Sequence, residues 1–277
     1  MTRGLTPIAK TIGYADFSWN VLTGCRHGCA WCYARPIAER LQRQATLGDD
    51  CTQPGGGLHE IRYPHGSGAD SYRYGFEPTF HSHRLRAPAQ RRKPAVIFVS
   101  DMGDALGAWW PAAWIAQTLG VIRACPQHQF LLLTKHPIRY AEFELPPNAW
   151  PGVTLTGAED EDKEGRLSYF LGATEGAHRR RWVSYEPILG PLPPATTAFV
   201  SWVVMGPLNG PRRTPYITSI TGRLLWDAIN ACRFDNVPVW LKDECRPFLG
   251  GLGGLRQEHP EGLARLRETR KEATMSG

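Results

Sequence analysis

A repeating pattern of short apolar runs from residue 95 onward constrains the fold more than any other feature. Each run is rich in β-branched residues and stops at polar residues: AVIFVSD (95–101), QFLLLTK (129–135), GVTLTG (152–157), RWVSYEP (181–187), WVVMGP (202–207) and VPVWLKD (237–243). Continuous apolar strands of this kind are typical of a parallel sheet that is covered on both faces. The sequence therefore predicts such a sheet.

Longer segments separate the runs, and three of them have the apolar spacing of helices. Their apolar residues recur at three and four positions in 111–125, 163–173 and 221–233. With SWNVLT (18–23) as a first strand, about seven βα units can be counted. We expect an α/β fold, a full or partial (β/α) barrel rather than an open doubly wound sheet. No G-x-G-x-x-G follows a strand and no G-x-x-x-x-G-K-[ST] occurs, which argues against dinucleotide and P-loop sites.

One region lacks this alternation of strand and helix patterns. Residues 48–83 mix Gly, Pro, His and Tyr without the periodicity of a helix or a strand. Long irregular segments in compact domains are usually functional or mobile. We expect a single barrel domain over 1–277, with 48–83 as an insertion or substrate lid after the first helix.

Polar residues stand at the carboxyl ends of the predicted strands. This is the face on which (β/α) barrels place their active sites. Any one of these residues could instead cap a helix, but six strands that end this way indicate a polar mouth. The residues at or near these ends are Ser100, Asp101, Thr134, Lys135, Thr154, Thr156, Tyr185, Glu186, Lys242 and Asp243, with the apolar Met205 at the end of 202–207.

Three thiols lie within eight positions in TGCRHGCAWCYA (23–34), at Cys25, Cys29 and Cys32. A redox or nucleophilic site needs one or two thiols, so the third has no role in it. A structural zinc site needs four ligands, and His27 would have to reach the same tetrahedron from inside the short loop. A [4Fe–4S] cluster is a cube whose iron corners each take a thiolate, and one loop with this spacing can hold three corners. The fourth iron is then open to another ligand.

The other four cysteines are scattered along the chain. Cys51, Cys125, Cys232 and Cys245 have the sequence context of ordinary core or surface residues. An odd total of seven, in a reducing compartment, argues against a disulfide framework.

The charge and the hydropathy of the chain bound its partners. Its N-terminal segment lacks the apolar core of a secretory signal and no run of about 18 apolar residues occurs, so we expect a cytoplasmic protein without a membrane partner. The formal net charge is +6, and basic residues gather at 84–93, 178–181 and 211–213. Such segments are compatible with a polyanionic partner, although basic runs are also common on ordinary solvated surfaces.

The pattern C-x3-C-x-aromatic-C, with Trp31 at the aromatic position, resembles the signature of the radical S-adenosylmethionine superfamily. In that superfamily the loop follows the first strand of a partial (β/α) barrel, as Cys25 follows SWNVLTG here. The resemblance implies that Cys25, Cys29 and Cys32 hold a [4Fe–4S] cluster and that S-adenosylmethionine binds the fourth iron. It also implies an electron donor such as a flavodoxin or ferredoxin.

A closer resemblance extends from residue 18 to about 248. Blocks such as CYARPIAERL, VIFVSDMGDAL, LLLTKHPIRY, RWVSYEPILGPL and VPVWLKDE are similar to those of a phage-associated, three-cysteine radical S-adenosylmethionine family. Some members are linked to hypermodified thymines in phage DNA, so the host cytoplasm is the implied location. This chain has GPLNG (206–210) and LKDEC (241–245) where Gly-Gly-Glu-Ser-Gly and Lys-Gln-Trp-Gly types are usual, which leaves substrate contacts there open.

The resemblance also implies cofactor contacts, and Trp31 in the cysteine motif is the first of them. In the superfamily the end of the second strand contacts the amino group of S-adenosylmethionine, which here corresponds to Ser100, Asp101, Met102 and Asp104. Later strand ends are candidates for its carboxylate or ribose hydroxyls. These candidates are Thr134, Lys135 and Glu186, although Lys135 and Glu186 could instead form a salt bridge with each other.

The expected activity is an isomerisation. A 5′-deoxyadenosyl radical would abstract hydrogen from a glycyl adduct on a modified thymine in DNA, and the adduct would move from nitrogen to carbon. A base in duplex DNA must leave the stack to enter a barrel. Basic segments and the aromatic YRYGF (72–76) are compatible with DNA binding. The alternatives are a radical enzyme for a free nucleoside or a peptide, and a nucleic-acid-binding or repair protein with a structural cluster.

Overall fold

The computed structural model describes residues 4–45, 51–55, 57–63, 68–158, 165–209, 218–250, 255–264 and 266. The chain forms two compact units. Unit 1 comprises Met1–Ile8, Ala15–Leu132 and Pro146–Asn148, and unit 2 comprises Ala9–Tyr14, Leu133–Leu145 and Ala149–Gly277. The expectation of one barrel domain over 1–277 stays a prediction.

Parallel strands form the centre of unit 1. Strands β2 and β7 pair in parallel, and so do β7 and β8, while β1 pairs antiparallel with β2. The four residues of β7 are all buried, as the apolar run predicts. Helix α2 lies between β7 and β8 in the sequence and buries Ile115, Leu119 and Ile122. The elements are β1 (Thr6–Pro7), β2 (Phe17–Trp19), β7 (Val96–Val99), α2 (Ala112–Arg123) and β8 (Gln129–Thr134).

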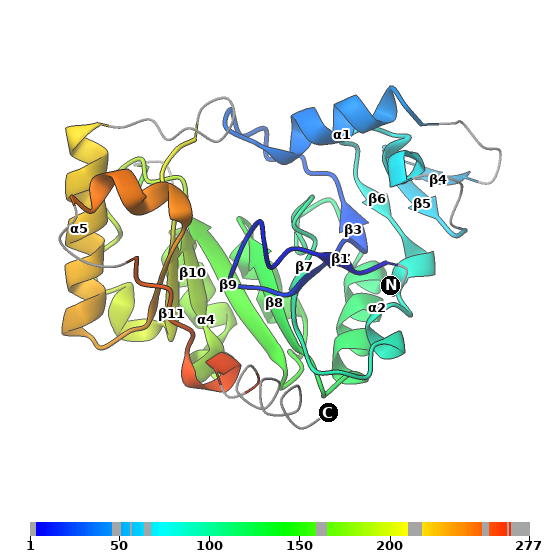
Figure 1. Cartoon of the computed structure of the whole chain (residues 1–277). Coiled ribbons are helices and arrows are strands. Elements are labelled where there is room, and N and C mark those ends of the chain that lie inside the picture. Colours follow the sequence, from blue (N-terminus) through cyan, green and yellow to red (C-terminus); the bar gives the residue numbers. More distant parts are fainter. Residues whose placement is uncertain are drawn as a thin grey trace, which may run out of the picture. The chain divides into compact units, whose positions relative to one another are not determined.

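Unit 1 also contains a second, smaller sheet with the order β3-β6-β5-β4, which Figure 1 shows beside helix α1. The sequence pattern predicted one strand over 18–23 and no strand over 48–83. Instead, the first run divides into β2 and β3, which belong to different sheets, and the irregular region supplies β4, β5 and β6. The elements are β3 (Leu22–Thr23), α1 (Ala34–Gln42), β4 (Cys51–Gly55), β5 (Leu58–Ile61) and β6 (Thr79–Phe80).

The strands of unit 2 pair in parallel, β9 with β10, β10 with β11 and β11 with β12. Their starts are packed by aromatic rings, since Tyr14 lies 6.2 Å from Trp182, 5.6 Å from Trp202 and 6.2 Å from Trp240 between ring centroids. The elements are β9 (Ala149–Leu155), α4 (Arg166–Ala173), β10 (Trp182–Tyr185), β11 (Trp202–Met205), α5 (Ser219–Phe234) and β12 (Val239–Leu241).

The larger sheet has the order β1-β2-β7-β8-β9-β10-β11-β12. Its order is open, with β1 and β12 at its two ends, so the expected α/β class is confirmed in its partial-barrel form. All six apolar runs after residue 95 are strands, and the three helical segments are α2, α4 and α5. The described residues also include short 3-10 helices at Gly68–Tyr72, Ser82–Arg84, Pro88–Gln90, Pro137–Glu142, Glu175–Arg180, Thr197–Phe199 and Asp243–Phe248.

Candidate functional site

The three clustered cysteines lie on the loop between β3 and α1, which we call the cysteine loop (24–33). Cys25, Cys29 and Cys32 are half-buried and form no disulfide. The Cys32 amide donates to the Cys29 carbonyl at 3.2 Å, which closes a turn between two of them. Cys25 and Cys32 also pack against a small buried cluster of Ala34, Ala38, Phe76 and Met102.

The start of the cysteine loop requires a glycine. Gly24 has a φ of +84°, and a Cβ there would lie 2.4 Å from the Glu77 carbonyl oxygen. Its amide donates to the Met102 carbonyl at 3.0 Å, and Gly24 forms a parallel bridge with Gly103. The next amide, of Cys25, donates to the Phe76 carbonyl at 3.3 Å. The backbone thus joins the cysteine loop to the turn that follows β7.

That turn begins at Ser100, which the sequence predicted as a cofactor contact. Ser100 has a φ of +61°, in the left-handed region that non-glycine residues rarely adopt. Its amide donates to the Trp19 carbonyl at 3.0 Å and its carbonyl accepts from the Gly103 amide at 3.1 Å. Its hydroxyl is buried and has no hydrogen-bond partner among the described residues. A buried hydroxyl in this state is an exception, since nearly all buried polar groups in folded proteins have a hydrogen-bond partner.

Asp101 and Met102 are held by the end of β2. The Ser18 hydroxyl donates to an Asp101 carboxylate oxygen, and the Asn20 side-chain oxygen accepts from the Met102 amide at 3.1 Å. Burial raises the pKa of the Asp101 carboxyl, and the hydrogen bonds from Ser18 and Asn20 oppose that shift. The Tyr33 hydroxyl donates to the Asp101 carbonyl at 2.5 Å, so the far end of the cysteine loop contacts the same turn.

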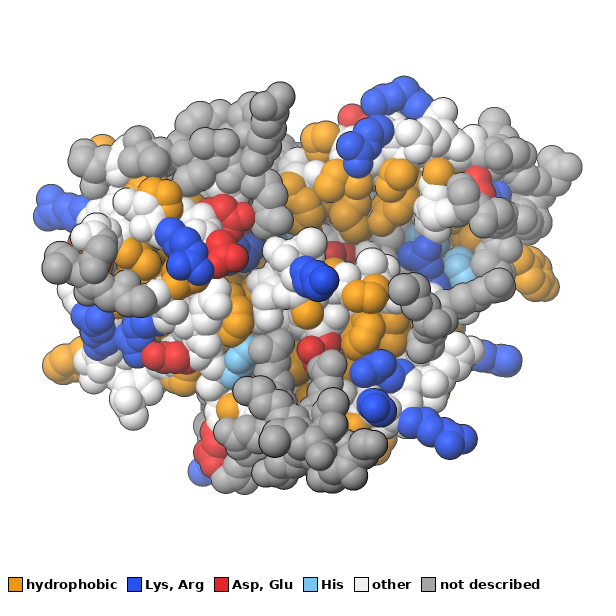
Figure 2. Space-filling view, viewed as in Figure 1, with side chains coloured by type: hydrophobic (Ala, Val, Ile, Leu, Met, Phe, Trp, Pro, Cys, Tyr) orange, Lys and Arg blue, Asp and Glu red, His pale blue; other side chains and the backbone are white. Residues whose placement is uncertain are grey.

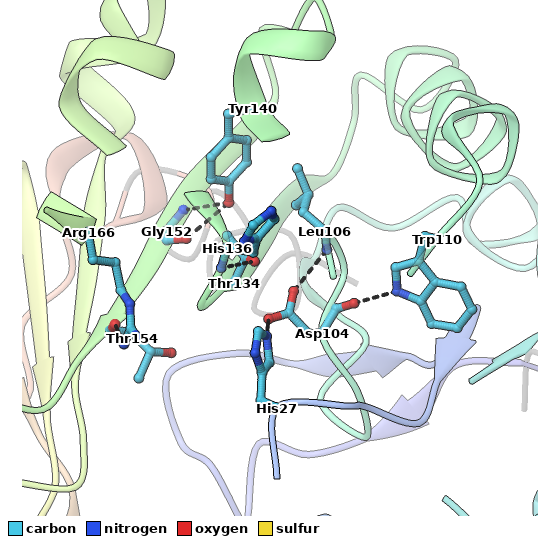
Figure 3. Close-up of polar contacts among 10 residues, drawn as sticks. All are labelled: His27, Asp104, Leu106, Trp110, Thr134, His136, Tyr140, Gly152, Thr154 and Arg166. Carbon is cyan, nitrogen blue, oxygen red and sulfur yellow. Dashed lines mark hydrogen bonds and ion pairs between the residues drawn. The ribbon is translucent and has the colours of Figure 1, made fainter. Parts of the chain in front are cut away.

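Asp104 is bound to the cysteine loop itself. Its Oδ2 atom lies 2.8 Å from Nε2 of His27, the residue midway between Cys25 and Cys29, as Figure 3 shows. Its Oδ1 atom accepts from the Leu106 amide at 2.9 Å. The sequence singled out His27 only as a fourth zinc ligand. In the structure, its ring points to Asp104.

Two aromatic side chains of the cysteine loop are exposed. Trp31, the predicted cofactor contact, is 40% exposed and Tyr33 is 60% exposed. Figure 2 shows hydrophobic side chains next to Lys and Arg side chains over α1, the helix that follows this loop. Aromatic faces of this kind are suited to stacking on a planar ring.

The donor set of the loop fits an iron–sulfur cluster. Among the described residues, no three His, Cys, Asp or Glu side chains converge as the ligands of one metal ion would. A [4Fe–4S] cluster takes its thiolates at separate iron corners, so its ligands do not converge on a single ion. Three half-buried thiols on one loop, none in a disulfide, supply three such corners.

Thr134, Lys135 and Glu186 belong to unit 2. The Thr134 hydroxyl oxygen accepts from the His136 amide at 2.8 Å, which Figure 3 shows. Lys135 is half-buried. Glu186, after β10, forms an ion pair with Lys242, after β12. The partner of Glu186 is thus Lys242, and not Lys135 as the alternative in the sequence analysis had it.

Gly206 leaves the space for this ion pair. A Cβ on Gly206 would lie 2.8 Å from Glu186 Oε1 and 3.1 Å from Lys242 Cδ. Gly206 follows β11, so the ends of three neighbouring strands of unit 2 form one polar group. Both segments in which the sequence departs from the phage-associated family, 206–210 and 241–245, begin at this group.

Several arginines of the basic segments form hydrogen bonds within the fold. Arg84 donates to the Asn20 carbonyl at 2.8 Å, Arg180 to the Ala149 carbonyl at 3.0 Å, and Arg181 to the Thr174 hydroxyl at 2.9 Å. Residues 211–213 lie outside the described residues. The guanidinium groups of Arg84, Arg180 and Arg181 thus bond within their own unit, and the phosphate-binding rim stays a prediction.

The aromatic segment 72–76 is also packed inside unit 1. Phe76 is buried, and the Tyr74 ring stacks on the His59 ring at a centroid distance of 3.7 Å. Burial raises the pKa of Tyr72 to about 12. Tyr74 and Phe76 thus pack within the fold, and a contact of this segment with DNA stays a prediction.

The fold and the site define an α/β protein with a three-thiol loop at the end of a short strand. The chain belongs to the family described as "Protein of unknown function (DUF5131)", which matches residues 9–245. A comparison with curated proteins gives no significant match. No helix in the described part of the chain has the length and apolar character that crossing a bilayer requires.

Two solved structures are similar to this chain at 10% sequence identity. One is a spore photoproduct lyase complexed with dinucleoside spore photoproduct, with a TM-score of 0.45 over 77% of this chain and 60% of that chain. The other is a double mutant of spore photoproduct lyase with bound AdoMet and dinucleoside spore photoproduct, with a TM-score of 0.44 over 92% and 61%. This chain thus matches about three fifths of the length of each lyase chain.

Proposed function

We propose that this protein is a radical S-adenosylmethionine enzyme in which Cys25, Cys29 and Cys32 hold a [4Fe–4S] cluster. The observation that carries the proposal is the three-thiol loop, bonded through Gly24 to the turn after β7. This arrangement brings the thiols and the candidate cofactor contacts at 100–104 together in one unit. When bound, the cluster and S-adenosylmethionine supply a 5′-deoxyadenosyl radical that abstracts hydrogen from an unactivated C–H bond.

The side chains of unit 1 have distinct roles in this proposal. The Ser100 hydroxyl binds a polar atom of S-adenosylmethionine, since it is buried and has no partner among the described residues. The exposed Trp31 ring covers the cofactor and excludes water. Asp101 and Met102 shape the turn on which Ser100 stands. Thr134, Lys135 and Glu186 stay proposed contacts of the carboxylate or the ribose.

Anaerobic reconstitution with iron and sulfide tests the cluster. The wild type should bind about four iron and four sulfide per chain, and the triple change of Cys25, Cys29 and Cys32 to Ala should bind none. Cys232 and Cys245 are matched controls, because burial raises the pKa of each thiol to about 12 and keeps it protonated. One equivalent of zinc without iron in the wild type would end the proposal.

For the substrate, we propose a glycyl adduct on a modified thymine in phage DNA, which the enzyme isomerises after hydrogen abstraction at the glycyl α-carbon. Exposed arginines of unit 1 support a polyanionic substrate. Arg40 and Arg43 lie at the end of α1, and Arg26 lies in the cysteine loop before it, where it also donates to the Gly57 carbonyl at 3.0 Å. Exposed basic side chains neutralise phosphates and release counterions, so affinity for DNA should fall steeply with salt.

Isotope transfer tests the substrate. DNA with α-deuterated glycyl adducts should give an isomer of otherwise unchanged composition, with deuterium in 5′-deoxyadenosine or returned to the product. A flavodoxin or ferredoxin should serve as the electron donor. Turnover of the free nucleoside or of a peptide, but not of the DNA, would contradict the proposed substrate and leave the proposed radical chemistry in place. A cluster that forms without cleavage of S-adenosylmethionine would instead favour a nucleic-acid-binding or repair protein.

A further inference from the structure

The pair of His27 and Asp104 joins the middle of the cysteine loop to a fixed point of unit 1. The Nε2 and Oδ2 atoms lie 2.8 Å apart, and the two side chains are 22% and 5% exposed. His27 is two residues from both Cys25 and Cys29. The position of its ring therefore governs the backbone that carries these two thiols.

Asp104 is itself held on several sides. Its Oδ1 atom accepts from the Leu106 amide at 2.9 Å, and its carbonyl accepts from Nε1 of the buried Trp110 at 2.7 Å. The same carbonyl accepts from the Gly107 amide at 3.3 Å. Figure 3 shows His27, Leu106 and Trp110 around Asp104. Asp104 is thus a rigid point to which the cysteine loop is attached.

The Trp109 ring supports the His27 ring from another direction. The ring centroids are 5.1 Å apart at an interplanar angle of 73°, an edge-to-face contact. Trp109 can occupy this place because Gly107 has no side chain, since a Cβ there would lie 2.2 Å from the Trp109 ring. Two independent contacts therefore fix the orientation of His27.

The cysteine loop has further contacts at its ends and at Arg26, whose Nη2 atom donates to the Gly57 carbonyl at 3.0 Å. Gly24 bonds to Met102 at the start, and Tyr33 bonds to Asp101 at the end. Between them, Gly28 has a φ of +69°, and a Cβ on Gly28 would have no described heavy atom within 4 Å. The backbone after His27 is thus open, and the side chains of Arg26 and His27 hold the middle of the loop to the rest of unit 1.

We propose that Asp104 is a positioning residue that clamps the cysteine loop through His27, so that the thiols are ordered before the cluster assembles. This inference rests on the proposed function. A loop that is ordered in the apo protein loses its conformational entropy during folding instead of during cluster binding. Loss of the clamp should therefore loosen the loop in the apo protein and weaken retention of iron.

Limited proteolysis of the apo protein measures the loop directly. Arg26 is an exposed trypsin site inside the loop, adjacent to His27. Because a hydrogen bond to a charged group is lost, Asp104→Asn and His27→Ala should each be cleaved after Arg26 about tenfold faster than the wild type. His27→Gln keeps a donor for Asp104 and should restore part of the protection.

Asp16→Asn is the matched control. Asp16 is another buried carboxylate of unit 1, and it accepts from the Val96 amide at 2.9 Å, in the parallel sheet. Its change should leave cleavage after Arg26 at the wild-type rate. The double variant Asp104→Asn with His27→Ala should be cleaved no faster than either single variant, because both changes remove one interaction.

Iron retention separates the two proposals. After anaerobic reconstitution, the clamp variants should lose iron to a chelator several-fold faster than the wild type and Asp16→Asn. Faster cleavage after Arg26 in a protein that binds no iron would support the clamp and overturn the cluster. Wild-type rates of cleavage and of iron loss in both Asp104→Asn and His27→Ala would overturn the clamp and leave the cluster in place.

Discussion

At Ser100 the backbone and the side chain are both held at a cost in the apo protein. The left-handed φ of +61° is unfavourable for a residue with a Cβ, and the buried hydroxyl lacks a partner among the described residues. Costs of this kind collect at functional sites, where binding of a ligand offsets them. Within this turn, we therefore expect Ser100 to contribute most to the free energy of ligand binding.

Ser100→Ala distinguishes the effect of the hydroxyl from that of the left-handed backbone. Ala removes the hydroxyl but keeps the Cβ that makes this backbone unfavourable. Removal of an unsatisfied buried hydroxyl should raise the free energy of unfolding of the apo protein by about 1 kcal/mol. It should also weaken S-adenosylmethionine binding by about tenfold. Urea denaturation and equilibrium dialysis measure the two effects.

Thr79→Val provides the contrast. Thr79 is equally buried in unit 1, but its hydroxyl donates to the Glu77 carbonyl at 3.0 Å. Its removal should lower stability and leave cofactor affinity unchanged. If Ser100→Ala also lowered stability and left that affinity unchanged, the hydroxyl would be an ordinary structural group.

At this scale the local sequence is informative about the thiols and less informative about the arginines. Three cysteines in eight positions indicate a cluster ligand set without knowledge of the fold. Arginines in a basic run look alike, yet Arg84, Arg180 and Arg181 donate to groups distant in sequence. The contact of His27 with Asp104 spans 77 positions. Such contacts depend on the tertiary fold, which local patterns do not contain.

At the scale of elements, the two glycines on either side of Cys25 in the cysteine loop form a natural pair for comparison. Gly24 and Gly28 both have a positive φ, of +84° and +69°. They differ in their surroundings, because a Cβ on Gly24 would meet the Glu77 and Phe76 backbone whereas a Cβ on Gly28 would meet no described atom within 4 Å.

Gly28→Ala should therefore lower the free energy of unfolding by about 1 kcal/mol, the cost of the left-handed backbone alone. Gly24→Ala should add the cost of displacing the backbone at 76–77, for a total of about 3 kcal/mol. Urea denaturation of the apo proteins measures the difference. Equal losses would show that the loop start moves freely and that its bond to Met102 is weak.

The predictability of an element followed its length and its burial. Strands β7 to β12 are continuous apolar runs, which a buried parallel sheet requires and which the sequence displays. Strands β3 and β6 have two residues each, too few for any alternation to appear. Their pairing is a property of the backbone ladder, so 48–83 looked irregular although it holds most of a sheet.

At the scale of the molecule, neutral buried histidines make stability depend on pH. Burial lowers the pKa of His59, His81 and His128, all in unit 1, and the pKa of His81 lies well below its ordinary value. As the pH falls below about 6.5, the unfolded chain therefore takes up protons at these residues more readily than the folded chain does. Their contribution to stability is therefore present above about pH 6.5 and is lost as the pH falls.

The urea midpoint of the apo protein should accordingly decrease between about pH 7.5 and pH 5.5, with a loss of up to about 1.4 kcal/mol per pH unit for each such histidine. His81→Gln should make this dependence shallower, since glutamine does not titrate and can still bond to the Thr23 hydroxyl, which lies 2.8 Å from His81 Nε2. A slope identical to that of the wild type would assign the effect to other groups.

The antiparallel pairing of β3 with β6, Leu22 with Phe80 and Thr23 with Thr79, has an evolutionary consequence. The chain enters and leaves the region of the cysteine loop, α1 and the small sheet at adjacent points. A segment with such neighbouring ends can be lengthened, shortened or exchanged as a cassette while the register of β2 and β7 is kept. A transplanted segment would have to keep its contacts with the turn after β7, to Asp101, Met102, Gly103 and Asp104.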